Sequence, residues 1–245
     1  MGQYQFGRRK QRPLKPKKSD DPYIFTIGNL LEWEHHAEHQ LTKAGNNSAT
    51  AKEETIKKLR EKQQQVPVQI SESVYISNAS GVSDVDKLHK LGITHVLNVA
   101  GSMAAWSPQE EYEKKGIHYK MVDAIDEPTY DMLDLHLEEC LEFMRGAQNN
   151  NSKNEARIVV HCYAGCNRSG VIVAAEHMLR TRTNVLETVL HCRTCRGNAF
   201  LTNNGFQGQL VALARREGLL GPAPGSRGCV VEPWLWRKVR KEIEH

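Results

Sequence analysis

Apolar and polar positions along the middle of the chain predict strands interleaved with helices. The segments 69–80, 93–100, 117–125 and 156–160 read as strands from their alternation or their β-branched content. Apolar residues recur every three or four positions in 85–91 and 131–145, which predicts helices, and another helix is predicted over 169–180. Strands that alternate with helices predict one layered α/β domain, spanning residues 66–219.

The residues on either side of this domain have a different pattern. After a capping box of Asn29 and Glu32, five apolar residues form one helical stripe: Leu30, Trp33, Ala37, Leu41 and Ala44. A second, mostly polar helix is predicted from Thr50 to Gln65, with Thr50 and Glu53 as its capping box. We therefore expect a helical N-terminal extension over 28–65. Residues 220–245 are expected to form a linker and a C-terminal helix that docks on the domain.

Charge is concentrated at the start of the chain. Residues 1–20 hold seven Lys or Arg and one acid, whereas the other 225 residues hold 26 basic and 28 acidic residues. We expect residues 1–27 to be a basic disordered tail. It is suited to polyanions such as nucleic acid or acidic lipid, and Pro13, Pro16 and Lys18 match a bare motif for SH3-type grooves. A solvated tail without a partner is the simplest alternative.

Targeting signals and cysteines indicate the compartment. The first residues show no apolar core of a secretory signal, and no apolar run is long enough for stable membrane insertion. The six cysteines are therefore expected to be reduced thiols of a protein located in the cytoplasm, with the nucleus as a second location. His35 and His39 lie one helical turn apart, but we interpret them as part of a solvated face and predict no metal site.

The most informative segment surrounds Cys162. A predicted strand runs into His161 and Cys162, and a five-residue turn leads to Arg168, where a helix begins. Such a turn directs backbone N–H groups inward at a helix N-terminus, which forms a cradle for an anion. That field and the positive charge of Arg168 favour the thiolate of Cys162, a nucleophile. The Arg168 fork matches two phosphate oxygens, and Gly165 permits close approach of the backbone.

These residues resemble a known family. HCYAGCNRSG resembles the signature loop of cysteine-dependent protein phosphatases, and VYISNAS, DKLHKLGITHVLNVA and NNGFQGQL resemble segments of their dual-specificity branch. The resemblance covers about 150 residues in order and excludes both tails. It implies a phosphatase-like α/β fold, with a central, mostly parallel sheet flanked by helices, and a reaction without metal or organic cofactor.

The resemblance also implies roles for single residues. Phosphate would be bound by the loop residues Tyr163, Ala164, Gly165, Cys166 and Asn167 together with Arg168. Asp126 would be the general acid, with Asp123 as the alternative. Ser169 would assist departure of the thiolate, or simply cap the helix. His161 would orient the loop by hydrogen bonding. Cys166 is interpreted as filler, with a reversible disulfide to Cys162 as the alternative.

The predicted activity is hydrolysis of phosphotyrosine, phosphoserine and phosphothreonine through a phosphocysteine intermediate, in protein dephosphorylation and signalling. Expected partners are phosphorylated protein substrates, kinases among them. Two other functions stay open. One is an RNA 5′-triphosphatase, because the loop ends in Asn167-Arg168 and the tail is basic. The other is a non-catalytic phosphoprotein-binding scaffold, although that class usually lacks the nucleophile or the arginine. A phosphoinositide phosphatase is disfavoured because positions 163–167 contain no Lys or Arg.

Overall fold

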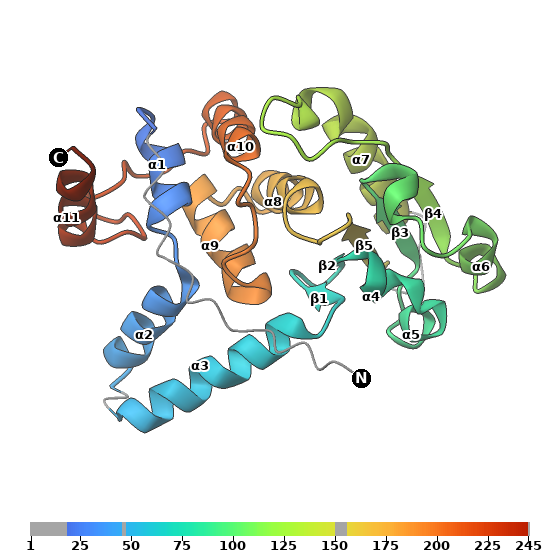
Figure 1. Ribbon diagram of the computed structural model, residues 1–245, viewed down its shortest axis with the longest axis horizontal. Coiled ribbons are helices and arrows are strands. Elements are labelled where there is room, and N and C mark those ends of the chain that lie inside the picture. Colours follow the sequence, from blue (N-terminus) through green and yellow to red (C-terminus); the bar gives the residue numbers. More distant parts are fainter. Residues whose placement is uncertain (1–18, 46–47, 150–155, 245) are drawn as a thin grey trace, which may run out of the picture.

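A five-stranded sheet lies at the centre of the computed structural model, which describes residues 19–45, 48–149 and 156–244 (Figure 1). The strand order is β1-β2-β5-β3-β4. The strands are β1 (Val68–Gln69), β2 (Val74–Ser77), β3 (His95–Asn98), β4 (His118–Met121) and β5 (Ile158–His161). Only the edge pair β1–β2 is antiparallel among these strands, and the other neighbours run parallel. The predicted α/β fold with a mostly parallel sheet is confirmed.

Alternating side chains bury both faces of this sheet. In β5, Ile158 and Val160 join the main apolar core, whereas Val159 joins a smaller cluster on the other face. Helices α7 (Met132–Asn149), α8 (Arg168–Thr181), α9 (Val185–Arg196) and α10 (Asn204–Arg216) contribute to the main core. Helices α5 (Val85–Lys90) and α6 (Gln109–Lys114) cover the smaller cluster. Period-two burial of this kind is what a sheet between two helical layers requires.

Two short helices follow the ends of parallel strands. Helix α4 (Ala79–Ser83) comes directly after β2, and the 3-10 helix η1 (Gly101–Ala104) comes after β3. The loop after β5 leads into α8. Because parallel strands end at the same edge of a sheet, these connections lie together at one edge. In folds of this class ligands bind at that edge.

The N-terminal extension is helical, as predicted, and packs against α9 and α10. It comprises α1 (Pro22–Asn29), α2 (Trp33–Lys43) and α3 (Ala49–Gln64) (Figure 1). The buried guanidinium of Arg193 on α9 joins it to the domain: its Nη1 donates to the carbonyls of Ile27 and Leu31, each at 2.8 Å, and its Nε donates to that of Phe200 at 3.1 Å. Burial lowers the pKa of this guanidinium to about 10.

The predicted end of the tail is wrong, because ordered structure begins before residue 27. The Asp21 carboxylate accepts hydrogen bonds from the N–H groups of Tyr23 and Ile24, at 2.9 and 3.2 Å, and so caps α1. Phe25 and Ile27 of α1 are buried in the core. Residues 1–18, which carry the basic charge, lie outside the described residues.

Both predicted capping boxes are also wrong. Asn29 ends α1 instead of starting α2, and its side chain donates to the carbonyl of Phe25. Glu32 is the N-cap residue of α2 but makes no side-chain capping bond. Helix α3 is capped two residues earlier than expected, by Ser48, whose hydroxyl accepts from the N–H of Ala51.

The C-terminal helix α11 (Pro233–Glu244) docks on the rest of the chain, as expected. Its Trp236 ring meets the Phe25 ring of α1 edge to face, with centroids 5.3 Å apart. Leu235 and Val239 of the same helix pack against the main core. Within the described ranges, no helix combines the length and the hydropathy needed to cross a bilayer.

Candidate active site

The loop between β5 and α8 holds Cys162 at its base. Cys162 is fully buried, and its Sγ accepts a hydrogen bond from the N–H of Gly165 at 3.2 Å. Ser169, also buried, lies in the first turn of α8 with its Oγ 3.2 Å from the same sulfur. The helix begins at Arg168, so Ser169 is not its N-cap residue. The thiol is therefore held in place by two polar contacts at a helix N-terminus.

The loop keeps its shape because it packs on the end of β2. Gly165 has a positive φ of 69°, and a Cβ atom at this position would lie 2.5 Å from the carbonyl oxygen of Ser77. The carbonyl of Tyr163 accepts a hydrogen bond from the N–H of Ala79 at 3.2 Å. Glycine is thus required at 165 both by conformation and by space.

Arg168 connects this loop to the segment that follows β4. Its Nη1 donates to the carbonyl of Ala124 at 3.0 Å, and its Nε lies 3.9 Å from Oδ2 of Asp126. The guanidinium is buried, and Nε has no hydrogen-bond partner among the residues described. This N–H is available to an anion in the loop, because a buried guanidinium favours a charged acceptor.

The two carboxylates predicted as alternatives for the general acid occupy different environments. Asp126 is partly buried and faces Arg168, and its Oδ1 accepts a hydrogen bond from Nδ2 of Asn203 at 2.9 Å. Asp123 is exposed, and its side chain lies against Gly101. Of the two, Asp126 is the carboxylate that the fold directs toward Arg168.

Asn203 was not singled out in the sequence, yet it positions Asp126. Its Oδ1 caps α10 by accepting from the N–H groups of Gly205 and Phe206, at 3.0 and 3.3 Å, while its Nδ2 donates to Asp126. The segment of Asp126 comes close here, since a Cβ atom on Gly205 would lie 1.7 Å from the carbonyl of Pro128. A sequence signal was present, because asparagine is a typical N-cap residue, but the segment was quoted only for its resemblance and no helix was predicted there.

Asn167 links the loop between β5 and α8 to the segment that precedes α10. Its Oδ1 accepts from the N–H groups of Thr202 and Asn203, at 2.9 and 3.0 Å, and from the Thr202 hydroxyl at 3.2 Å. The carbonyl of Cys166 accepts from the N–H of Leu201 at 3.0 Å. The Asn167 carboxamide oxygen is therefore committed to a structural role.

The remaining loop residues have clear partners. The Cys166 thiol donates to the carbonyl of Ala164 at 3.5 Å, and burial raises its pKa. The same carbonyl accepts from Nη2 of Arg196 at 3.3 Å, a contact that the sequence did not predict. All six cysteines are free in the structure. Packing of Cys166 as a half-buried thiol agrees with its interpretation as filler, and its reaction with Cys162 stays an alternative.

The hydrogen bond by which His161 was expected to orient the loop stays a prediction. Neither ring nitrogen has a partner of strict hydrogen-bond geometry within the described part of the chain, but a contact with the backbone of Cys162 acts to raise the pKa of the ring. The ring is buried at the end of β5, and this burial is the larger effect and lowers its pKa to about 4. His161 therefore packs at the base of the loop, beside the backbone of Cys162.

Acidification is expected to destabilise the fold between pH 6.5 and pH 4. Burial lowers the pKa of His95, His161 and His177 from 6.5 to about 4. As pH falls through this window these rings bind protons in the unfolded chain but not in the folded one. Stability is therefore lost toward acid, by at most about 1.4 kcal/mol per pH unit for each histidine. Urea denaturation at several pH values measures the slope. His95→Gln should reduce it, and an unchanged slope would contradict this explanation.

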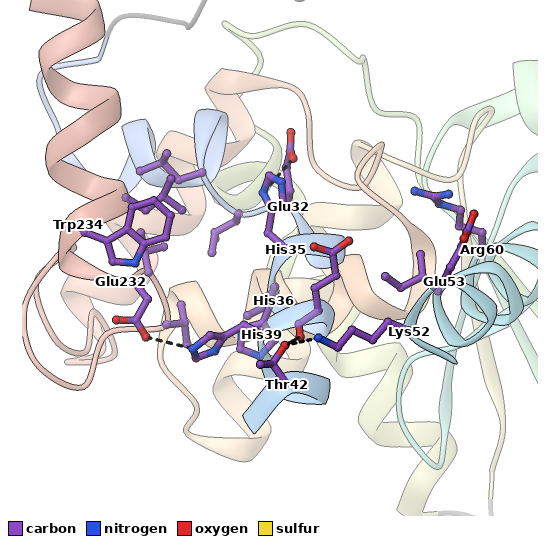
Figure 2. Close-up of a pocket in the computed structure, with 18 of the residues that line it drawn as sticks. Glu32, His35, His36, His39, Thr42, Lys52, Glu53, Arg60, Glu232 and Trp234 are labelled. Atoms are coloured by element: carbon purple, nitrogen blue, oxygen red, sulfur yellow. Dashed lines mark hydrogen bonds and ion pairs between the residues drawn. The ribbon is translucent and has the colours of Figure 1, made fainter. Parts of the chain in front are cut away.

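A second concave region lies away from Cys162. A cavity of about 910 Å³ is lined by α2, α3 and the segment before α11 (Figure 2). His35 and His39, predicted to lie on a solvated face, line this cavity and pair with Glu32 and Glu232, at 3.3 and 3.9 Å. No cluster of three or more His, Cys, Asp or Glu side chains suited to a metal ion is found in the ranges that the structure describes.

Comparison with known proteins places the catalytic region. The family model for the catalytic domain of dual specificity phosphatases matches residues 74–216. Dual specificity protein phosphatase 26 of Bos taurus is 37% identical over 143 residues, which are 58% of this chain and 64% of that protein. The Homo sapiens protein of that name is 36% identical over 143 residues, which are again 58% of this chain and 64% of that protein. Dual specificity protein phosphatase 13B of Homo sapiens is 30% identical over 147 residues, 60% of this chain and 71% of that protein.

Solved structures agree on the fold. Human DUSP28 superposes with a TM-score of 0.52 at 20% identity, covering 62% of this chain and 94% of that structure. The structure of DUSP15 superposes with a TM-score of 0.52 at 23% identity, and the match covers 72% of this chain and 93% of that structure. The match to the type-26 phosphatases spans less than two thirds of their length. By its sheet, its phosphate loop and the family model that covers more than half of it, the chain belongs to the dual specificity phosphatase family.

Proposed function

We propose that the protein hydrolyses phosphate monoesters on tyrosine, serine and threonine side chains of proteins through a phosphocysteine intermediate. One observation carries the proposal: three groups from separate elements converge, namely the buried Cys162 sulfur, the Arg168 fork and the Asp126 carboxylate. They supply a nucleophile, a two-point phosphate ligand and a proton donor, which are the groups that phosphoryl transfer requires.

In the first step the Cys162 thiolate attacks phosphorus. The S–P bond forms as the P–O ester bond breaks, and the Asp126 carboxyl transfers its proton to the departing oxygen. Arg168 and the N–H groups of residues 163–167 would stabilise charge on the equatorial oxygens. The partly exposed position of Asp126, on the segment after β4, gives it access to a substrate oxygen from solvent.

In the second step the Asp126 carboxylate takes a proton from water. The water oxygen bonds to phosphorus, the S–P bond breaks, and inorganic phosphate is released with the Cys162 thiolate. The Ser169 hydroxyl, 3.2 Å from the sulfur, is placed to donate a hydrogen bond to the departing thiolate. This agrees with the role that the family resemblance implies.

The site geometry disfavours the alternatives. The RNA 5′-triphosphatase hypothesis used Asn167, but the carboxamide oxygen of that residue is engaged by residues 202–203. A non-catalytic scaffold would not require Asp126 to be held beside Arg168. The deciding assay compares phosphopeptides, triphosphate-ended RNA and inositol phospholipids as substrates, each with a Cys162→Ser control. Cysteine-dependent release of phosphate from RNA or lipid, without release from peptides, would refute the proposal.

We further propose that residues 1–20 place the enzyme in the cytoplasm or nucleus by contact with polyanions or an SH3-type groove, and that kinases are among its substrates. The support for the role of residues 1–20 is their charge, with seven basic residues and one acid in this segment. Deleting 1–20 should leave turnover of a small aryl phosphate within about twofold. It should remove the salt-sensitive part of binding to nucleic acid or acidic vesicles. Equal binding and unchanged distribution in cells would contradict this role.

A further inference from the structure

Large apolar side chains are exposed beside the phosphate loop. Seven such side chains are exposed in the described residues, and four of them lie on the connections after β3, β4 and β5. Their exposed fractions are 73% for Met103, 54% for Trp106, 54% for Ile125 and 53% for Tyr163. We call these four residues the apolar rim. Exposed apolar surface gathered at one place usually marks an interaction site.

The three loops that carry the apolar rim are in contact with one another. The Trp106 and Tyr163 rings meet edge to face, with centroids 6.0 Å apart and planes at 81°. The N–H of Gly101 donates to the carbonyl of Val122 at 3.0 Å, which joins the loop of Met103 to the loop of Ile125. Arg168 joins the loop of Ile125 to the phosphate loop through Ala124.

A substrate placed with its phosphate over Cys162 must cross this surface. Tyr163 is adjacent to Cys162 in the sequence, and Ile125 is adjacent to Asp126. Consecutive Cα atoms of a peptide are about 3.8 Å apart, so residues next to a phosphorylated side chain reach only the loops around the site. Neither loop positions 163–167 nor the four residues of the apolar rim contain Lys or Arg. Arg196 of α9 reaches the loop, where its Nη2 donates to the carbonyl of Ala164 at 3.3 Å.

We infer that the apolar rim is a specificity surface that selects phosphoproteins with apolar residues directly beside the phosphorylated residue. The inference rests on the proposed function and deepens it, since it assigns the substrate class of the same site. Trp106 is the anchor, because a large aromatic side chain in contact with a second ring offers apolar area at little entropic cost. Met103 and Ile125 add exposed apolar area on the two loops joined to this one.

The test is a ratio of two kcat/KM values. Two phosphotyrosine peptides differ only in the residues directly before and after the phosphotyrosine, which are Leu in one and Ser in the other. The unmodified protein should prefer the Leu peptide about tenfold. Trp106→Ala should reduce this ratio to about two or less, mainly by raising KM for the Leu peptide, and Trp106→Phe should retain most of it.

A matched control uses a second exposed tryptophan. Trp234 is 62% exposed and lines the cavity of Figure 2, so Trp234→Ala should leave the ratio unchanged. A thermal melt of each variant reports folding, and Met103→Ala provides a second test of the surface that leaves the Trp106–Tyr163 contact in place.

The outcomes separate the two proposals. If neither peptide is hydrolysed above the Cys162→Ser background, the proposed function fails. If both are hydrolysed with equal kcat/KM, or if Trp106→Ala keeps the full preference, the function stands and the inference on the apolar rim is wrong. If the protein hydrolysed phosphoinositide vesicles faster than either peptide, and if this activity required Trp106, the apolar rim would be a lipid-binding surface. That result would also overturn the inference.

Discussion

Cys162→Ser is expected to abolish hydrolysis while leaving phosphopeptide binding intact. A serine hydroxyl at the base of the loop is a far weaker nucleophile than a thiolate, whereas Arg168 and the loop N–H groups would still hold phosphate. The loss in kcat should be at least about 10³-fold, as for removal of other covalent nucleophiles. Single-turnover assays with a phosphotyrosine peptide measure the loss, and isothermal titration with the same peptide measures the retained binding.

The control for Cys162→Ser is the same substitution at a cysteine outside the site. Cys195 lies half-buried on α9, and Cys195→Ser should keep turnover close to that of the unmodified protein. Arg168→Lys should lose most activity although the charge is kept, because an ammonium group lacks the planar fork that binds two phosphate oxygens while Nη1 donates to the carbonyl of Ala124. Turnover of a few per cent in pure Cys162→Ser would refute the assignment of the nucleophile.

Local sequence pattern was sufficient to predict the central strands and the phosphate loop, but not the edge of the sheet. The single strand expected over 69–80 is in fact the antiparallel pair β1 and β2. The strand that ends at His161 is a short β-branched run buried on both faces, and the strand that ends at Asn98 is buried from Val96 onward, as central strands are. The loop was predictable because its chemistry is local: Cys162, Gly165 and Arg168 lie within one turn between a strand and a helix. The spacing alone determines which N–H groups can face an anion.

Contacts between distant segments account for what the sequence did not predict. Helix α1 forms where a tail was expected, and its C-terminal carbonyls are bound by Arg193, which is 166 residues away from Ile27. The N–H of Trp33 at the start of α2 donates to Asn198, also far along the chain. Asn203 was not singled out, since nothing local shows that its amide reaches Asp126. Only the folded structure shows such pairs of distant residues.

Asp126→Asn is expected to slow hydrolysis of alkyl and tyrosyl phosphates by about 10²–10⁴-fold, the usual contribution of a positioned acid. Aryl phosphates with a good leaving group need less protonation and should lose less. Stopped-flow measurement of both steps with alkyl, tyrosyl and activated aryl phosphates provides the comparison.

Asn203→Ser tests how Asp126 is held, because serine is also a good N-cap residue but lacks the Nδ2 donor. It should retain stability close to that of the unmodified protein and lose part of the activity, in the same direction as Asp126→Asn. Combined with Asp126→Asn it should add little further loss, since both changes act on one interaction. Fully additive losses in the double variant would show that Asn203 does not act through Asp126.

If Asp123→Asn lost its activity while Asp126→Asn remained active, the general acid would be Asp123, three residues earlier. The exposed carboxylate of Asp123 beside Gly101 would then have to move to reach the substrate.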